Sequence, residues 1–183
     1  MKIAIGVMGS SSVPSAEVED RARELGIQIA NRGATLITGA TTGLPHAAAK
    51  GAKSAGGLVI GFSPAITLQE HIAFGLPLAD HDFVFCTGLS FKGRNLINVR
   101  SGQAVIFAGG SMGALNEFTI AYDEGKIIGI LQDTGGFCDH MEEWMQHLAK
   151  PQSRSVIHYS RDPKTLVNTV HEAIQKEFPQ FFS

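Results

Sequence analysis

Short apolar runs recur along the chain and alternate with segments of helical character. Each run has the length and content of a buried strand. The predicted strands cover residues 2–8, 34–38, 57–62, 82–87, 104–108, 126–131 and 155–159. Helices are expected at about residues 15–31, 46–55, 91–102 and 113–124, and from residue 162 onward. Residues 65–80 and 133–151 are less regular, and each is expected to hold one short helix.

The strands are continuous apolar runs rather than alternating ones. Helices cover both faces of a parallel sheet, so its strands carry apolar residues on both sides. The pattern therefore predicts an α/β fold, a Rossmann-like three-layer sandwich with a parallel sheet of about seven strands and helices on both faces. No repeat, low-complexity tract or linker interrupts it, so we expect residues 1–183 to form a single domain.

Three of the predicted strands end in loops rich in glycine, serine and threonine, at residues 9–12, 39–43 and 109–113. Parallel strands bring their carboxyl ends to one edge of the sheet, where ligands bind. Glycines let the backbone approach an anion, and the free N–H groups of a helix start favour negative charge. We therefore predict a nucleotide or phosphate site at this edge. Its candidate residues are Gly9, Ser10, Ser11, Gly39, Thr41, Thr42, Gly43, Gly109, Gly110, Ser111, Met112, Gly113 and Ala114.

The helix before the third loop carries its polar residues on one narrow arc. At 100° per residue, Arg94, Asn95 and Asn98 share a sector, and apolar residues fill much of the remainder. Such a helix is expected to be buried, with the polar stripe facing a cavity. The alternative is a surface arginine with two asparagines that cap the turn, but the narrow stripe favours the cavity. Glu117, on the next helix, would add a fixed anion to the site.

Composition narrows the classes of function. The net charge is −2 and there is no basic block, so nothing indicates a nucleic-acid or membrane partner. The N-terminus does not resemble a signal peptide, and the two cysteines, Cys86 and Cys138, have no metal-type spacing. We expect a cytoplasmic protein with reduced thiols, in which Cys86 is a small buried hydrophobic residue.

The seven histidines show no tight ligand cluster, so no metal site is predicted, and surface or capping roles are favoured. His46 opens the helix after the second glycine loop and is expected to be solvated. A dinucleotide oxidoreductase is poorly supported, because the loop after the first strand lacks the G-x-G-x-x-G pattern.

Two blocks of sequence carry a family resemblance. The first runs from Gly39 to Pro45 and continues through residues 49–52, 56–57 and 59–61 to Pro64. The second is Arg94-Asn95 followed by Gly109-Gly110-Ser111-Met112-Gly113-Ala114-Leu115-Asn116-Glu117. In order and spacing these blocks resemble the signature of the Lonely Guy family, Rossmann-like proteins long labelled lysine decarboxylases. The resemblance covers roughly residues 2–131.

Characterised members of that family hydrolyse cytokinin riboside 5′-monophosphates, or AMP, to the free base and ribose 5-phosphate. The resemblance implies that Arg94 and Glu117 are the catalytic pair and that Gly109–Ala114 cradle the phosphate. The chemistry suits these residue types. Positive charge develops on the sugar ring as the N-glycosidic bond breaks, and a carboxylate stabilises it and orients water.

The chain also departs from the family motif. Ala108 replaces a proline, the loop is one residue longer, Ala114 replaces a threonine, and Asn95 stands where the hydrolases usually have lysine. These features resemble a second branch of the superfamily, which includes molybdenum-cofactor carrier proteins that bind a pterin phosphate without turning it over.

Two functions therefore stay open. One is a nucleoside 5′-monophosphate phosphoribohydrolase that requires no cofactor. The other is a non-catalytic carrier or sensor of a phosphorylated ligand, such as molybdenum cofactor or a nucleotide. The resemblance also implies a homodimer or a higher even-numbered homo-oligomer. The apolar side chains expected to contribute to its interface are Ile97, Val99, Phe118 and Tyr122.

Overall fold

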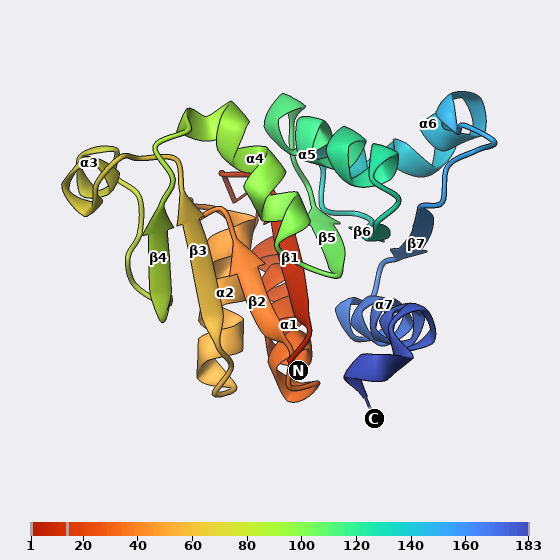
Figure 1. Cartoon of the computed structure of the whole chain (residues 1–183), viewed down its shortest axis with the longest axis horizontal. Coiled ribbons are helices and arrows are strands. Elements are labelled where there is room, and N and C mark those ends of the chain that lie inside the picture. Colours follow the sequence, from red (N-terminus) through yellow and green to blue (C-terminus); the bar gives the residue numbers. More distant parts are fainter. Residues whose placement is uncertain (1, 14, 183) are drawn as a thin grey trace.

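The computed structural model describes residues 2–13 and 15–182. In these residues seven parallel strands form one sheet in the order β4-β3-β2-β1-β5-β6-β7 (Figure 1). The strands are β1 (Ala4–Gly9), β2 (Thr35–Thr38), β3 (Val59–Ser63), β4 (Phe83–Cys86), β5 (Ala104–Ala108), β6 (Ile127–Leu131) and β7 (Val156–Ser160). The predicted parallel sheet of seven strands is confirmed.

The winding of the sheet reverses between β1 and β5. The chain adds β2, β3 and β4 on one side of β1, then crosses back to place β5 on the other side. Ile5 pairs with Ala104 and Gly9 with Ala108, so the two strands end side by side. This is the switch point at which open α/β sheets leave a crevice for ligands. Two of the three glycine loops begin there.

Helices cover both faces of the sheet, which confirms the Rossmann-like three-layer arrangement. The helices α1 (Ala16–Asn31), α2 (Leu44–Ser54) and α7 (Pro163–Glu177) pack on one face. The other face carries α4 (Ser90–Arg100) and α5 (Met112–Asp123). The short elements are α3 (Leu68–Ala73), α6 (Met141–Leu148) and two 3-10 turns, η1 (Gly136–Asp139) and η2 (Pro179–Phe181). Figure 1 shows α3 and α6 at opposite ends of the molecule. No helix of the described residues is long and apolar enough to cross a membrane.

Each face of the sheet has its own apolar core. Leu25, Leu36 and Val170 lie in the layer beneath α1, α2 and α7, and all three are fully buried. Phe107 and Phe118 lie in the layer beneath α4 and α5, with their ring centroids 5.9 Å apart. Burial of side chains of this size contributes about 1.5–3 kcal/mol each. The continuous apolar strands of the sequence reflect these two cores.

Local signals set some of the helix starts. The Ser15 side chain accepts a hydrogen bond from the Val18 N–H and caps α1 as predicted. α7 begins with Pro163 in its first turn, as expected. α2 begins at Leu44, two residues earlier than predicted, because its first N–H is held by a tertiary bond to the Ser10 carbonyl at 2.9 Å.

The edge strand β4 differs from the prediction. Its phenylalanines, Phe83 and Phe85, are 54% and 50% exposed. Cys86 is half-buried rather than buried, so that prediction was wrong. The physical reason is the position of the strand: β4 lies at the edge of the sheet, and neither apolar core includes any of its residues.

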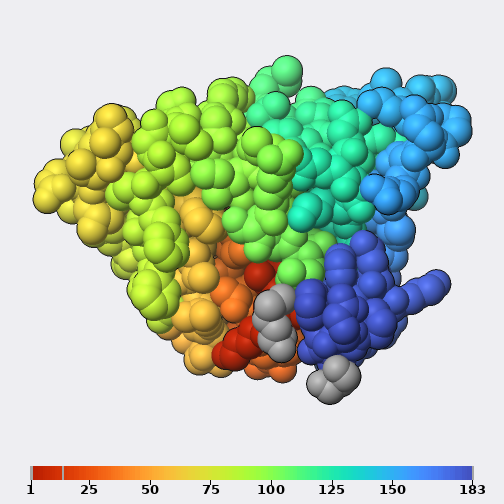
Figure 2. All heavy atoms as spheres, in the orientation of Figure 1, coloured from red at the N-terminus to blue at the C-terminus, as the bar shows by residue number. Residues whose placement is uncertain are grey.

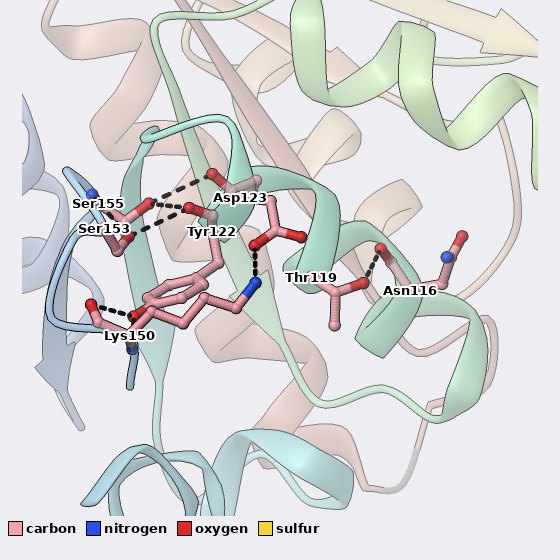
Figure 3. A network of polar contacts seen from close by, with 8 residues as sticks. Asn116, Thr119, Tyr122, Asp123, Lys150, Ser153 and Ser155 are labelled. Atoms are coloured by element: carbon pink, nitrogen blue, oxygen red, sulfur yellow. Dashed lines mark hydrogen bonds and ion pairs between the residues drawn. The ribbon is translucent and has the colours of Figure 1, made fainter. Parts of the chain in front are cut away.

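The connection from α6 to β7 is fastened to the end of α5 (Figure 3). The Lys150 N–H donates to the Tyr122 hydroxyl at 2.7 Å, and the Lys150 ammonium lies 2.6 Å from the Asp123 carboxylate. The hydroxyls of Ser153 and Ser155 donate to the Tyr122 carbonyl at 3.3 and 3.0 Å. The Tyr122 carbonyl, which also accepts the Gly125 N–H at 3.2 Å, thus ties the C-terminus of α5 to this connection.

Candidate functional site

A cavity of about 180 Å³ opens at the carboxyl edge of the sheet, at the switch point beside β1. It lies between the glycine loops and the first turns of α4 and α5. Its lining residues are Met8, Gly9, Ser11, Gly39, Thr41, Pro45, Phe91, Lys92, Arg94, Asn95, Ser111, Gly113, Ala114 and Glu117. The three predicted loops therefore share one edge and one cavity.

Hydrogen bonds join the first glycine loop to the end of β5 and to the second loop. Ser10 donates its N–H to the Ala108 carbonyl at 3.1 Å, and the Thr42 hydroxyl donates to the Ser11 carbonyl at 2.9 Å. Gly43 has φ +81°, and a Cβ there would lie 2.2 Å from the Ser10 carbonyl oxygen. Glycine is needed at this position for both reasons. Ser10, Thr42 and Gly43 thus shape the site rather than line it.

The polar arc of α4 faces inward. Arg94 and Asn95 are each 5% exposed and Asn98 is fully buried, whereas Leu96 on the opposite side is 36% exposed. α4 therefore buries a polar stripe together with the apolar Val99, whereas an ordinary surface helix turns only its apolar side to the core. This burial confirms the predicted orientation and excludes the alternative of a surface arginine with capping asparagines.

Arg94 and Glu117 lie close together beneath the cavity. The Arg94 Nη1 is 4.0 Å from the Glu117 Oε1, and the Asn98 amide donates to the same oxygen at 2.9 Å. With its amide nitrogen turned to the carboxylate, Asn95 also reaches Oε1, at 3.3 Å. The Arg94 Nε has no hydrogen-bond partner in the described residues, although it is buried. Buried polar groups are normally paired, so this nitrogen points to a missing acceptor.

Burial is the largest influence on the pKa values of Glu117 and Arg94. Removal of Glu117 from water raises the pKa of its carboxyl, while the charges of Arg94 and Lys92 and the Asn98 hydrogen bond partly oppose that rise. Burial likewise lowers the pKa of the Arg94 guanidinium, and the charge of Glu117 opposes that change. A carboxyl with a raised pKa is suited to accept a proton near neutral pH.

The start of α5 completes the site. Ser111 is the N-cap residue, but its side chain makes no capping bond. The N–H groups of Met112, Gly113 and Ala114 occupy the first turn, where no intrahelical partner is available. These donors and the helix dipole favour an anion. The anion would lie beside the buried guanidinium of Arg94.

The structure separates the predicted site residues into two groups. Those that line the cavity are Gly9, Ser11, Gly39, Thr41, Arg94, Asn95, Ser111, Gly113, Ala114 and Glu117. Those that do not line it are Ser10, Thr42, Gly43, Asn98, Gly109, Gly110 and Met112. Met112 is 74% exposed because its side chain points outward from the first turn of α5. Their roles in binding or catalysis stay predictions.

Four lining residues were not predicted: Met8, Pro45, Phe91 and Lys92. Lys92 is detectable in retrospect, because it lies three residues before Asn95 and therefore on the same side of α4. Phe91 follows Ser90, the first residue of α4, and its ring is half exposed at the cavity. Neither residue belongs to a motif, so helical spacing was the signal for Lys92, and the sequence carried none for Phe91.

Some of the histidines are not surface residues. His46 was expected to be solvated, but its side chain is 16% exposed, and its Nε2 lies 3.2 Å from the Asp80 carboxylate. The ring of His46 is stacked on His81, whose Nε2 lies 2.9 Å from the Thr38 hydroxyl. The reason is that the segment before β4, which contains Asp80 and His81, packs against the first turn of α2. Among the described residues, no group of three potential ligands is arranged to hold a metal ion.

The apolar residues expected at a subunit interface lie mostly inside the chain. Val99 is fully buried, and Phe118 and Tyr122 are 4% and 9% exposed. They pack against the sheet because α4 and α5 turn these residues toward the core. The expectation that they form free apolar surface was therefore wrong.

Comparisons with known proteins agree with this architecture. A curated protein of Archaeoglobus fulgidus, described as uncharacterized, is 35% identical over 128 residues, which are 70% of this chain and 79% of that protein. A cytokinin riboside 5′-monophosphate phosphoribohydrolase of Mycobacterium tuberculosis is 28% identical over 153 residues, 79% of this chain and 78% of that one. The solved structure of a molybdenum cofactor binding protein from Rippkaea orientalis superposes with a TM-score of 0.79 at 29% identity. The superposition covers 95% of this chain and 98% of the Rippkaea orientalis chain.

Both branches of the resemblance seen in the sequence are thus represented among the relatives, and that resemblance is confirmed. The model of the SLOG cluster4 family matches residues 2–167. This match extends well beyond the signature blocks and includes β7 and the start of α7. The chain belongs to the SLOG cluster4 family.

Proposed function

We propose that this protein binds a nucleoside 5′-monophosphate in the cavity between α4 and α5 and hydrolyses its N-glycosidic bond. The products are the free base and ribose 5-phosphate. The observation that carries the proposal is the buried Arg94–Glu117 pair, 4.0 Å apart, beside the open first turn of α5. The similarity to a phosphoribohydrolase of M. tuberculosis supports the same reaction.

The phosphate would bind where the cationic groups of the cavity converge. The first-turn N–H groups of α5, the free hydroxyl of Ser111 and the guanidinium of Arg94 all lie at this end. Arg94 offers donors in a planar fork, which suits a phosphate oxygen pair. Lys92 at the rim adds a second positive charge. The ligand would therefore be anchored by its phosphate.

Glu117 would act on the sugar. As the bond between C1′ and the base nitrogen breaks, positive charge grows on the ribose ring, and a carboxylate nearby stabilises it. The same carboxylate can accept a proton from the attacking water. In the net reaction the hydroxyl of that water bonds to C1′ and a proton ends on the base. Asn98 and Arg94 keep Glu117 in place.

The second candidate function is a carrier or sensor that binds a phosphorylated ligand without turnover. Ala114, at the third position of α5, offers no hydroxyl to the phosphate, so the site lacks a contact that the hydrolase motif implies. The similarity to a molybdenum cofactor binding protein favours the same reading. The Nε of Arg94, which has no hydrogen-bond partner among the described residues, and the open helix start fit the phosphate of such a cofactor. In this case the site only holds its ligand.

One experiment separates the two functions. Purified protein is incubated with AMP and a panel of nucleoside monophosphates, and released base is quantified by liquid chromatography. A hydrolase releases base, and Glu117→Gln abolishes release while AMP affinity is nearly retained, because the lost interaction belongs to the transition state. The matched control is Glu124→Gln, which changes an acid that pairs with Arg100 away from the cavity. Its turnover should equal that of the wild type.

The other outcomes are equally informative. If no monophosphate of the panel loses its base and Glu117→Gln changes only affinity, the protein is a carrier or sensor. If adenosine binds as tightly as AMP, phosphate does not anchor the ligand and both candidate functions fail. Mass spectrometry of a small molecule that co-purifies with the protein would identify the ligand class directly.

We also propose that a second copy of the chain covers the apolar surface at the β4 end of the molecule. This surface comprises Ile66, Ile72, Phe74, Phe83, Phe85 and Phe91, which are 49% to 71% exposed. Residues 66–91 form the yellow-to-green end of the molecule in Figure 2. Exposed apolar patches of this kind mark interaction surfaces. Light scattering should give a homodimer or larger even-numbered oligomer, and Phe83→Asp should shift it toward the monomer. A wild-type monomer at micromolar concentration would contradict the proposal.

A further inference from the structure

The glycine loop of the site is held from behind by the segment that follows β6. The buried Thr134 hydroxyl accepts a hydrogen bond from the Gly109 N–H at 2.7 Å. The thiol of Cys138, also buried, donates to the Gly109 carbonyl at 3.0 Å. The Phe137 N–H donates to the Gly110 carbonyl at 3.0 Å. Three backbone groups of the loop are therefore bound from one side.

This segment, residues 134–139, is held by contacts of its own, and we call it the brace. The Asp139 carboxylate accepts hydrogen bonds from two of its N–H groups, at 3.1 and 3.0 Å. The Phe137 ring packs edge-on against Phe107, with centroids 5.6 Å apart, in the core under α5. Gly136 lies so near the loop that a Cβ there would stand 2.0 Å from the Gly110 carbonyl oxygen. The brace and loop therefore fit together backbone to backbone.

The brace determines which way the loop presents its donors. In a trans peptide the C=O and N–H of one unit point in opposite directions. The Gly109 carbonyl shares its unit with the Gly110 N–H, and the Gly110 carbonyl shares its unit with the Ser111 N–H. Both carbonyls point to the brace, so both N–H groups point away from it, toward the side where Ser111 and Gly113 line the cavity. Neither N–H donates to a backbone carbonyl of the described residues.

We propose that the brace is a positioning element: Thr134 and Cys138 hold the loop so that the Gly110 and Ser111 N–H groups face the phosphate of the ligand. This inference rests on the proposed phosphate site. Gly109 and Gly110 have φ +59° and +111°, and glycine rotates freely between such conformations. A rotated peptide would turn a carbonyl, which repels an anion, to the cavity. The hydrogen bonds from the brace remove that freedom.

The test uses inorganic phosphate as the probe, because it is independent of the unknown base. Phosphate is titrated into ¹⁵N-labelled protein, and the amide protons of Gly110 and Ser111 should move downfield. Thr134→Val keeps the side-chain shape but removes the hydroxyl, and Cys138→Ala removes the thiol. Each should reduce both amide shifts and weaken phosphate binding by about tenfold, the order expected for one impaired charge-assisted hydrogen bond. Thr134→Ser should restore the wild-type behaviour.

Controls separate the brace from the site itself. Cys86→Ala changes the other cysteine, on edge strand β4 and outside the cavity, and should leave phosphate affinity unchanged. If no amide in residues 109–114 of the wild type responds to phosphate, the proposed phosphate site fails. If only Met112, Gly113 and Ala114 respond, or if Thr134→Val binds phosphate as the wild type does, the brace inference is overturned. If Thr134→Val does not fold, Cys138→Ala is tested in its place, and wild-type shifts of the Gly110 and Ser111 amide protons in that variant overturn the inference.

Discussion

Gly39 offers a sharp test of the site, because a single added methyl group would displace Arg94. A Cβ at this position would lie 1.8 Å from the Arg94 Nη1 and 2.7 Å from its Cζ. Ordinary contacts between such atoms are about 3.5–4 Å. In Gly39→Ala the guanidinium must therefore move by roughly 1.5 Å or more. The residue cannot keep both its position beside Glu117 and its orientation toward the cavity.

The expected loss is larger for binding than for stability. The clash involves the far end of a flexible side chain, and replacement of glycine by alanine restricts the unfolded chain by about 0.4–1 kcal/mol. We therefore expect a net change in the free energy of unfolding of about 1 kcal/mol or less. Loss of one charge-assisted hydrogen bond from Arg94 to phosphate costs about 1.5–3 kcal/mol. This corresponds to a fall in AMP affinity of about tenfold to more than a hundredfold.

Calorimetric titration with AMP measures the affinity, and urea denaturation measures the stability. The matched control is Gly93→Ala, the same substitution on the residue before Arg94. A Cβ there would lie 3.0 Å from the Leu89 Cβ, so the half-exposed Leu89 needs to shift by only a few tenths of an ångström. Gly93→Ala should bind AMP as the wild type does. If Gly39→Ala also retains wild-type affinity, the position of Arg94 does not matter for the ligand and the proposed anchoring is refuted.

Three further predictions concern charge and packing. Burial raises the native-state pKa of Glu117, so the native protein binds this proton more tightly than the unfolded chain. The free energy of unfolding of the wild type should therefore rise relative to that of Glu117→Gln as pH falls through the native pKa. Urea denaturation at several pH values measures both free energies, and a constant difference between the two proteins would contradict this. If the protein is a hydrolase, turnover requires ionised Glu117, so the acid limb of its pH–rate profile should have an apparent pKa above the ordinary carboxyl pKa of 4.5. An apparent pKa at or below 4.5 would argue against Glu117 as the base. Tyr122→Phe removes the hydroxyl that accepts the Lys150 N–H at 2.7 Å and should lower the free energy of unfolding by about 1–3 kcal/mol, as measured in urea, whereas an unchanged midpoint would show that water replaces this bond.

Much of the fold was predictable because its signals are local. The apolar run of Ala104–Ala108 is a strand buried on both faces, and it is found where the sequence placed it. The capping side chain of Ser15 and the proline at residue 163 mark helix starts through bonds within one turn. The start of α2 was misplaced because it depends on a contact between Leu44 and Ser10, which no local pattern encodes.

Part of the candidate site was also predictable from local signals. The narrow arc of Arg94, Asn95 and Asn98 is a property of helical spacing, and its burial followed from that spacing. The outward-facing Phe83 and the inward-facing Phe118 could not be told apart, because both are simply apolar in the sequence. Only the order of the strands and the packing of α5 decide which of them meets water.

The sequence by itself determined the alternation of strands and helices, the parallel sheet and the edge at which the glycine loops meet. These features follow from periodicity and from the handed connections of an α/β chain. The tertiary structure alone decided that Arg94 lies against Gly39 and that Thr134 supports Gly109 from 25 residues away. Contacts of this kind depend on where the backbone brings distant residues together, and hydrogen-bond partners at such separations leave no periodic trace in the chain.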